Sequence, residues 1–192
     1  MQKGETTRKK IIDTATDLIH ARGMNVVSVG DVLRASRTGK SQFYYHFESR
    51  EDLINSVLSN NTERICEMLS EPIESWEDVK NWIFMHAEFQ KHFEFTRGCP
   101  FGTAAYSLQA NQKKERESLQ AVLDKMRDRL IRFLETEKKA KRVSKDIAPK
   151  SLASFAVAAI QGALIIGLIE KNEKSVVLVL EETYAHLESF RI

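Results

Sequence analysis

The clearest structural pattern in this chain is SVGDVLRASRTGKSQFYYHFESREDL, residues 28–53. Apolar residues at positions 29, 32 and 33 predict a short helix, and Phe43 and Phe47, one turn apart, predict a second. A turn of three or four residues, 36–39, separates them. Two short helices joined in this way are typical of a helix-turn-helix, whose second helix can lie in the major groove of DNA.

If Phe43 and Phe47 face the core, the opposite side of the second helix presents polar side chains. Thr38 and Ser41 can serve bases or phosphates, and Gln42 can pair with a base edge. The adjacent Tyr44 and Tyr45, followed by His46, are better suited to contact the phosphates of a DNA backbone than to fill a core. The residues expected at DNA are Ser28, Thr38, Gly39, Lys40, Ser41, Gln42, Tyr44, Tyr45, His46 and Arg50.

Outside this stretch, apolar residues also recur at helical spacing, so the predicted fold class is all-α. Three helix starts carry a serine followed three residues later by an aspartate, a pairing that caps helices: Ser28 with Asp31, Ser49 with Asp52 and Ser75 with Asp78. Helices are expected up to residue 22 and over 28–35, 40–46, 50–69, 76–96, 103–109, 119–142, 149–169 and 175–190.

Composition fits a folded chain with an uneven charge. The 192 residues are 42% hydrophobic and 29% charged, with a net charge of +2. Residues 1–50 hold nine Lys/Arg against five Asp/Glu, whereas the remainder is slightly acidic. This predicts a polyanion-facing module at residues 1–50 and a body with a different role at residues 51–192. Two isolated cysteines, and no leader at Met1, favour a reducing, cytoplasmic location.

The stretch 152–169 is almost wholly apolar and raises the question of a membrane span. It has 18 residues, interrupted by Ser154 and Gln161, against the roughly 20 that a bilayer needs. A buried helix is therefore expected, and no membrane partner. Small residues would allow close helix contact (Ala156, Ala159, Ala163 and Gly167), and larger ones would supply burial (Leu152, Phe155, Ile160 and Ile166).

Residues 41–53, SQFYYHFESREDL, resemble the end of the DNA-binding domain of tetracycline-repressor-type (TetR family) transcription regulators. The family pattern is a small turn, a short recognition helix ending in Tyr-Tyr/His-His-Phe, and Ser/Lys-Lys/Arg-Glu-x-Leu opening the next helix. The resemblance covers about residues 7–55. Arg37 stands where the family usually has a turn glycine, and Ser41 where a small glycine usually opens the recognition helix.

The resemblance implies a homodimer with three N-terminal DNA-binding helices per subunit and a C-terminal body that binds a small effector. The last two helices would form the dimer interface. It further implies that the protein represses transcription from operator DNA and is released by its ligand. Such a regulator is not an enzyme, and neither catalytic residues nor a cofactor are expected.

Eight of the sixteen aromatic residues fall between Trp76 and Tyr106. Singly, each is best explained as core filling, but together they suit an apolar pocket for a largely apolar or aromatic effector. The residues expected to line it are Trp82, Met85, His86, Phe89, Phe93, Cys99, Phe101, Tyr106, Met126 and Phe155. Cys99 could be a redox-sensing thiol or a small buried filler in a turn.

Other chemistries lack the necessary pattern. Gly39-Lys40-Ser41 resembles the end of a phosphate-binding loop, but Arg34 stands where that motif needs a glycine. His86 and His92 lack the spacing of a metal-binding helix face, so no metal site is expected. Two other kinds of protein stay open: a small-molecule-binding helical protein without regulatory DNA binding, which Arg37 would favour, and a helical interaction adaptor.

Overall fold

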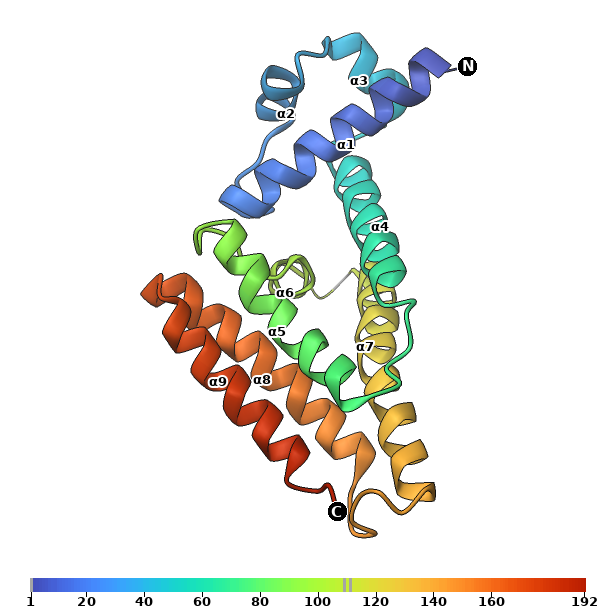
Figure 1. Cartoon of the computed structure of the whole chain (residues 1–192). Coiled ribbons are helices and arrows are strands. Elements are labelled where there is room, and N and C mark those ends of the chain that lie inside the picture. The colour runs from blue at the N-terminus through green and yellow to red at the C-terminus, as the bar shows by residue number, and fades with distance from the viewer. Residues whose placement is uncertain (1, 109, 111) are drawn as a thin grey trace. The chain divides into compact units, whose positions relative to one another are not determined.

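A computed structural model describes residues 2–108, 110 and 112–192. Those residues form α-helices and a single isolated β-bridge, which confirms the all-α prediction (Figure 1). The helices are α1 (Gln2–Arg22), α2 (Val29–Ser36), α3 (Lys40–His46), α4 (Arg50–Met68), α5 (Trp76–His92), α6 (Pro100–Tyr106), α7 (Lys113–Lys139), α8 (Pro149–Glu170) and α9 (Glu173–Glu188).

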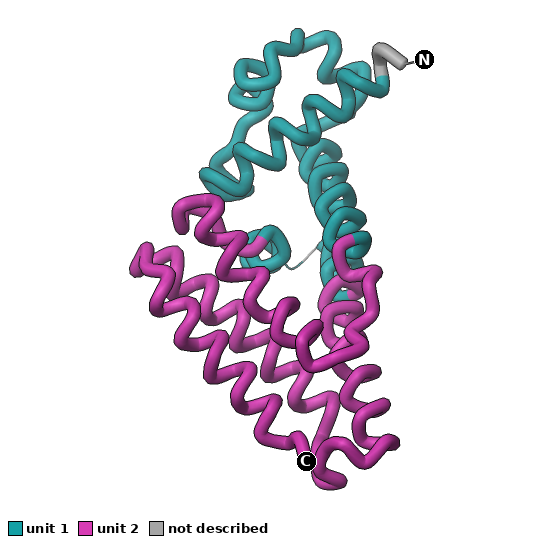
Figure 2. The backbone as a smooth tube through the Cα atoms, viewed as in Figure 1, with its two compact units in different colours: residues 1–67, 100–120 teal, residues 68–99, 121–192 magenta. Residues whose placement is uncertain are grey.

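The chain divides into two compact units (Figure 2). Unit 1 comprises residues 1–67 and 100–120, and unit 2 comprises residues 68–99 and 121–192. The core of unit 1 forms where α1 packs against α2 and α3. Ile11 and Ala15 of α1 are fully buried there, as are Val32 of α2 and Phe43 of α3.

All three predicted serines cap their helices. At α4 the Ser49 hydroxyl accepts from the Asp52 amide at 3.1 Å, and the Asp52 carboxylate accepts from the Glu48 amide. The Ser28 hydroxyl accepts from the Asp31 amide at 3.2 Å, and the Asp31 carboxylate accepts from the Ser28 amide at 3.0 Å. The same reciprocal pair, Ser75 and Asp78, starts α5. These contacts satisfy amide groups that have no partner inside the helix, so they fix where α2 and α5 begin.

Unit 2 is built around α8, which packs against both α5 and α9. Leu152, Ala156 and Ile160 are buried, as expected for a core helix, but Phe155 is 44% exposed. Among the described helices, α8 alone is long and apolar enough to span a membrane; 44% of its most apolar window is buried inside the fold. A core helix of a soluble protein has the same length and composition.

A close approach of helices in unit 2 involves Gln90 of α5. Gln90 is completely buried and donates from Nε2 to the Leu164 carbonyl at 2.7 Å. Its Oε1 lies so near Gly167 that a Cβ there would come within 2.1 Å of it, and within 2.5 Å of Val176 Cγ2 on α9. Glycine at position 167 is what lets α5, α8 and α9 meet at this point.

Several expected helix boundaries were wrong. The long helix expected over 119–142 runs from Lys113 to Lys139, and α6 ends at Tyr106, while its expected end at residue 109 lies outside the described residues. The helix predicted over 76–96 ends at His92, because Glu94 and Phe95 adopt left-handed backbone conformations with φ of 50° and 55°. The Phe95 amide donates back to the Gln90 carbonyl at 2.9 Å, closing the turn. The short helix expected from residue 103 begins at Pro100, since proline is well suited to the first helical turn.

Candidate nucleic-acid interface and effector region

The recognition helix α3 is held by two buried aromatic side chains. Phe43 and Phe47 are 0% and 1% exposed, and their ring centroids lie 5.3 Å apart. The Arg8 guanidinium of α1 lies 5.4 Å from the Phe47 ring centroid and donates to the Ser56 hydroxyl of α4. The predicted inward orientation of both phenylalanines is therefore confirmed.

The opposite face of α3 is open to solvent, as predicted. Tyr45 is 82% exposed and Tyr44 is 53% exposed. Ser41 and Gln42 are exposed as well, whereas Thr38 is half-buried. Lys40 extends its ammonium group to 5.9 Å from the Tyr44 ring centroid, which keeps this positive charge beside the exposed aromatics.

Gln42 and Thr38 also have contacts within their own subunit. Gln42 Oε1 accepts a hydrogen bond from the Gly39 amide at 3.0 Å and so caps the start of α3. The Thr38 hydroxyl lies 2.7 Å from the Ser36 hydroxyl. Gln42 Oε1 has a second lone pair, and Nε2 is a further donor, so Gln42 can keep its bond to Gly39 while it contacts a base.

The turn before α3 depends on Arg37, which adopts φ 52° and ψ 43°. Its amide donates to the Arg34 carbonyl, and the Thr38 amide donates to the Leu33 carbonyl at 3.2 Å. This is the left-handed helix end that usually takes a glycine. Gly39 has an ordinary φ of −82°, so it does not supply the turn conformation.

Two residues expected at DNA are engaged inside unit 1. Arg50 donates from Nε to the Val27 carbonyl at 2.9 Å and from Nη2 to the Met24 carbonyl. Ser28 is bonded to Asp31, whose pKa is lowered by hydrogen bonds from Ser28 and by Arg34. Both side chains therefore hold the segment between α1 and α2. The sequence predicted the capping role of Ser28 but not the contacts of Arg50.

The expected effector residues fall into two groups. In unit 2, Trp82 and Met126 are buried, His86 is half-buried, and the Phe89 and Phe93 rings pack edge to face at 5.0 Å. Met85 of the same helix is 40% exposed, and Cys99 is half-buried. In unit 1, α6 buries Phe101 and leaves Tyr106 77% exposed.

His86 is held in a defined orientation. Its Nδ1 lies 2.9 Å from the Trp82 carbonyl and 3.2 Å from the Ile83 carbonyl, so Nδ1 carries the proton and donates it. Burial lowers the pKa of His86 despite these backbone contacts. The imidazole is therefore neutral at pH 7.

Phe155, also expected at the effector, lies with its ring 5.0 Å from that of His186 on α9, and its side chain is 44% exposed. Its place in the effector site stays a prediction. Across the described part of the chain, no three His, Cys, Asp or Glu side chains are grouped closely enough to hold a metal ion.

A helix-turn-helix head with an exposed recognition face, followed by a helical body, defines the class of DNA-binding transcription regulators. Residues 11–57 match the family model for bacterial regulatory proteins of the tetR family. Residues 61–181 match the model for the tetracyclin repressor-like C-terminal domain. The chain belongs to the TetR family.

Relatives cover most of the chain. The HTH-type transcriptional repressor DhaR of Mycobacterium sp. (strain GP1) is 24% identical over 87% of this chain and 85% of its own length. An HTH-type regulator from the lacX 3′ region of Lactococcus lactis subsp. lactis is 26% identical over 67% of this chain and 68% of its own.

Solved structures show the same fold. The regulatory protein TetR from Rhodobacter sphaeroides superposes with a TM-score of 0.82 at 19% identity, covering 93% of this chain and 97% of that one. A TetR regulator from Chloroflexus aurantiacus gives 0.83 at 19% identity, covering 97% and 96%. The protein is thus a TetR-family transcriptional regulator with a DNA-binding helix-turn-helix, and not an enzyme. This favours DNA binding over the two alternative kinds of protein.

Proposed function

We propose that this regulator is a homodimeric repressor that leaves its operator when a small, largely apolar or aromatic effector binds. The exposed face of α3 carries the proposal, because buried Phe43 and Phe47 turn it outward. One relative is named a transcriptional repressor, which supports repression over activation. Such a protein would work in the cytoplasm on double-stranded DNA, with no cofactor and no membrane partner.

At DNA, we assign base contacts to Ser41 and Gln42 and phosphate contacts to Lys40, Tyr44 and Tyr45. All five are exposed on or beside α3. Thr38, Gly39 and His46 flank this face and complete the proposed interface. Since phosphate contacts release counterions, binding should weaken steeply as salt rises. Ser28 and Arg50 would act by holding the DNA-binding head in shape.

The proposed dimer face lies on α8 and α9. Large apolar side chains are exposed there although their helices belong to the core of unit 2: Phe155, Ile165, Ile169 and Leu178. On α8 they are separated by small or uncharged exposed residues, Ser151, Ser154 and Ala158. On α8 the exposed strip carries no charge over residues 151–169, and an exposed apolar strip of this kind is typical of a protein–protein contact. A second copy would cover it with the same strip.

For the effector we propose a site on α5 and α7 lined by Trp82, His86, Phe89, Phe93 and Met126. Aromatic and thioether side chains would bury an apolar ligand, and neutral His86 would offer one polar contact from Nε2. Met85 and Cys99, also in unit 2, stay as proposed neighbours, whereas Phe101 and Tyr106 belong to unit 1. The effector must bind the two states of the dimer with different affinity to release DNA.

The proposal is tested by capturing genomic fragments with the purified full-length protein, with and without a metabolite panel. Fragments that bind and are then released identify operator and effector together. Gln42→Ala should change the preferred sequence, with a cost of about 1–3 kcal/mol at the position read. Lys40→Ala is the matched comparison: it should weaken all sequences alike and reduce the salt slope by about 1.

An unchanged sequence preference in Gln42→Ala would show that the recognition face is wrongly assigned. Failure of every genomic fragment to bind would contradict operator binding as proposed. Fragments that bind but resist every metabolite would count against the ligand-release step only.

A further inference from the structure

Arg37 lies in the turn between α2 and α3, shortly before the recognition helix begins. Its side chain is exposed, whereas Ser36 before it is 1% exposed and Thr38 after it is half-buried. The hydroxyl groups of these two neighbours lie 2.7 Å apart, and the Thr38 amide donates to the Leu33 carbonyl. The exposed side chain of Arg37 therefore starts from a backbone position that is fixed on both sides.

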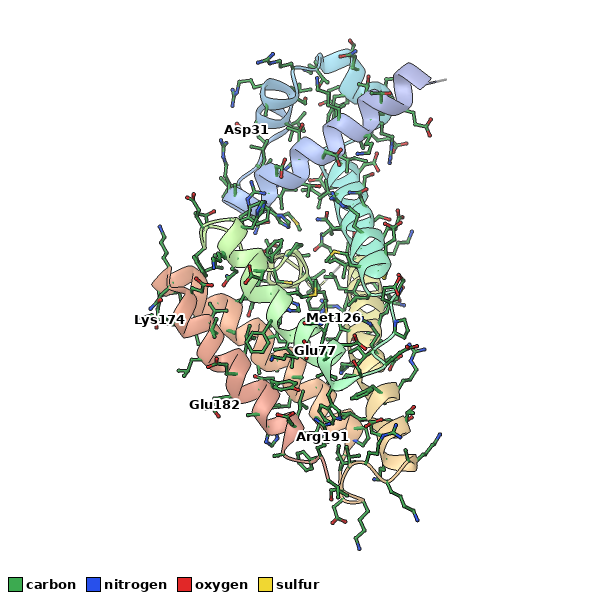
Figure 3. The ribbon with its side chains drawn as sticks, viewed as in Figure 1. Asp31, Glu77, Met126, Lys174, Glu182 and Arg191 are labelled. Carbon is green, nitrogen blue, oxygen red and sulfur yellow. The ribbon has the colours of Figure 1, made fainter. Side chains whose placement is uncertain are left out.

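The charge of Arg37 is not neutralised by a neighbouring carboxylate. Arg34, one turn earlier on α2, forms an ion pair with Asp31, which Figure 3 labels. Among the described residues, no hydrogen bond or ion pair joins the guanidinium of Arg37 to another group. Lys40, at the start of α3, adds a second positive charge beside the Tyr44 ring. The connection from α2 to α3 thus carries two positive charges that face solvent.

The backbone of Arg37 has a conformation that suits glycine better, with φ 52° and ψ 43°. The turn itself does not require an arginine, because glycine or asparagine would form it with less strain. Strained residues cluster at functional sites, where the side chain has a use that offsets the strain. Lys141, after α7, also has a left-handed φ, of 58°. Strain alone therefore does not identify a function, and the position of Arg37 beside α3 is needed as well.

The position of Arg37 in the helix-turn-helix corresponds to the edge of the major groove. In such motifs the first helix crosses the DNA backbone, and the N-terminal residues of the recognition helix reach the base edges. Arg37 lies between these two parts, after the end of α2 and before the start of α3. A long cationic side chain at this junction meets phosphates before it meets bases.

We propose that the Arg37 guanidinium contacts a phosphate of the DNA backbone at the edge of the major groove. The inference rests on the proposed placement of α3 at DNA. The contact adds affinity and salt dependence but does not read sequence, since every base pair carries the same phosphates. Because the TetR family usually has a glycine at this position, the contact is an addition to the usual interface. Arg37 then supports DNA binding instead of counting against it.

The test measures binding of the full-length protein to a labelled mixed-sequence duplex of about 30 base pairs, which holds two half-sites one helical turn apart. Fluorescence anisotropy over a range of salt concentrations gives the association constant and its salt slope. For each subunit bound, Arg37→Gly should weaken binding about eightfold at ~0.1 M salt and reduce the slope by about 1. The variant relieves the strained turn, so its weaker binding would not result from misfolding.

Two further variants separate the charge of Arg37 from the shape of the turn. Arg37→Asn also removes the charge, and asparagine tolerates the left-handed conformation, so it should bind DNA like Arg37→Gly. Arg37→Lys keeps a positive charge that can meet a phosphate, so it should keep the wild-type slope. A slope in Arg37→Lys as low as that in Arg37→Gly would overturn the proposed phosphate contact.

Lys141→Gly is the matched control. Lys141 is exposed and lies in a turn with the same pair of backbone hydrogen bonds as Arg37. Its amide donates to the Lys138 carbonyl, and the next amide donates to the Glu137 carbonyl. The control therefore relieves a similar conformation and removes the same charge, but it should leave DNA binding and the salt slope unchanged. Equal weakening in the two glycine variants would mean general charge attraction and would overturn the proposal.

Lys40→Ala separates failure of this inference from failure of the proposed recognition face. If Lys40→Ala lowers the salt slope and Arg37→Gly does not, the Arg37 contact is wrong and the recognition face stands. If neither variant changes the slope, or if the wild-type protein does not bind the duplex, both proposals are overturned. Lower slopes in both variants, with an unchanged slope in Lys141→Gly, would support the Arg37 contact.

Discussion

Arg37 has a backbone conformation that an L-residue with a side chain adopts at a cost, with φ at 52°. The left-handed region disfavours residues with a Cβ by roughly 1–2 kcal/mol relative to glycine. We expect Arg37→Gly to raise the free energy of unfolding by about 1 kcal/mol. Urea denaturation would show this as a higher midpoint with an unchanged slope.

Two variants separate the backbone effect from the lost charge. Arg37→Ala removes the same charge but keeps a Cβ, so it should give no comparable gain. Ala35→Gly, two residues earlier inside α2, should cost about 1 kcal/mol, because glycine there loses helix propensity. Equal stability of Arg37→Gly and Arg37→Ala would contradict the interpretation of the turn.

His86 predicts a pH dependence of stability. Its folded-state pKa is lowered by burial from an ordinary value of 6.5. Below pH 6.5 His86 therefore binds a proton more readily in the unfolded chain than in the folded protein. As the pH decreases, the free energy of unfolding decreases as well, until the folded-state pKa is reached. Wild type should lose more stability between pH 7.5 and 5.5 than His86→Gln in paired urea titrations. Parallel losses in the two proteins would contradict a neutral buried imidazole.

Among the elements, the contact of α8 with α5 and α9 depends on the absence of a side chain at position 167. A Cβ there would meet Gln90 Oε1 and Val176 Cγ2 far inside contact distance. Gly167→Ala should therefore destabilise the protein by about 1–3 kcal/mol, measured by thermal or urea unfolding.

Gly162 of the same helix is the matched control for that prediction. A Cβ at Gly162 would meet nothing within 4 Å. Gly162→Ala should stabilise the protein by about 0.5–1 kcal/mol, because alanine is the better helix former. Changes of the same sign in the two variants would show that helix propensity, and not the close approach, decides the outcome.

Helix starts that carry a serine–aspartate cap were predictable, whereas the starts of α6 and α7 were not. Ser28 with Asp31 and Ser75 with Asp78 form their caps within three residues of sequence, so local pattern suffices. The end of α5 was missed because apolar spacing continues through Phe93. The turn instead depends on two left-handed residues, Glu94 and Phe95, neither of which is a usual turn residue.

Site residues were predictable where one helix decides their direction. Inward Phe43 and Phe47 leave the opposite face of α3 exposed, which follows from helical periodicity alone. The contacts of Arg50 were not predicted, because its partners, the Met24 and Val27 carbonyls, lie 26 and 23 residues away. The contact of Phe155 with His186 was not predicted, because periodicity does not say which neighbouring helix an apolar face meets.

For the whole molecule, two-part organisation was expected from the basic first quarter of the sequence. The family models meet between residues 57 and 61, and the compact units divide near residue 67, with residues 100–120 joining the first unit. The expected boundary between residues 50 and 51 stays a prediction. The charge distribution predicts where a DNA-binding module lies in the sequence. It does not predict the residues at which a compact unit ends, because these depend on packing.

The proposed homodimer gives a prediction at the same scale. Leu178 is 61% exposed on α9, so Leu178→Glu should leave the subunit folded. A buried unpaired carboxylate on both sides of the proposed interface should dissociate the dimer and abolish operator binding. Light scattering after gel filtration would report the mass. Lys80→Glu, an exposed charge change on α5, should stay dimeric. A dimeric Leu178→Glu protein would place the interface elsewhere.

The meeting of Gln90 with Gly167 also has an evolutionary consequence. A methyl group at position 167 is destabilising as long as glutamine stands at position 90 and valine at position 176. Lineages of this regulator should therefore gain alanine at position 167 more often after smaller residues have appeared at positions 90 and 176 than before.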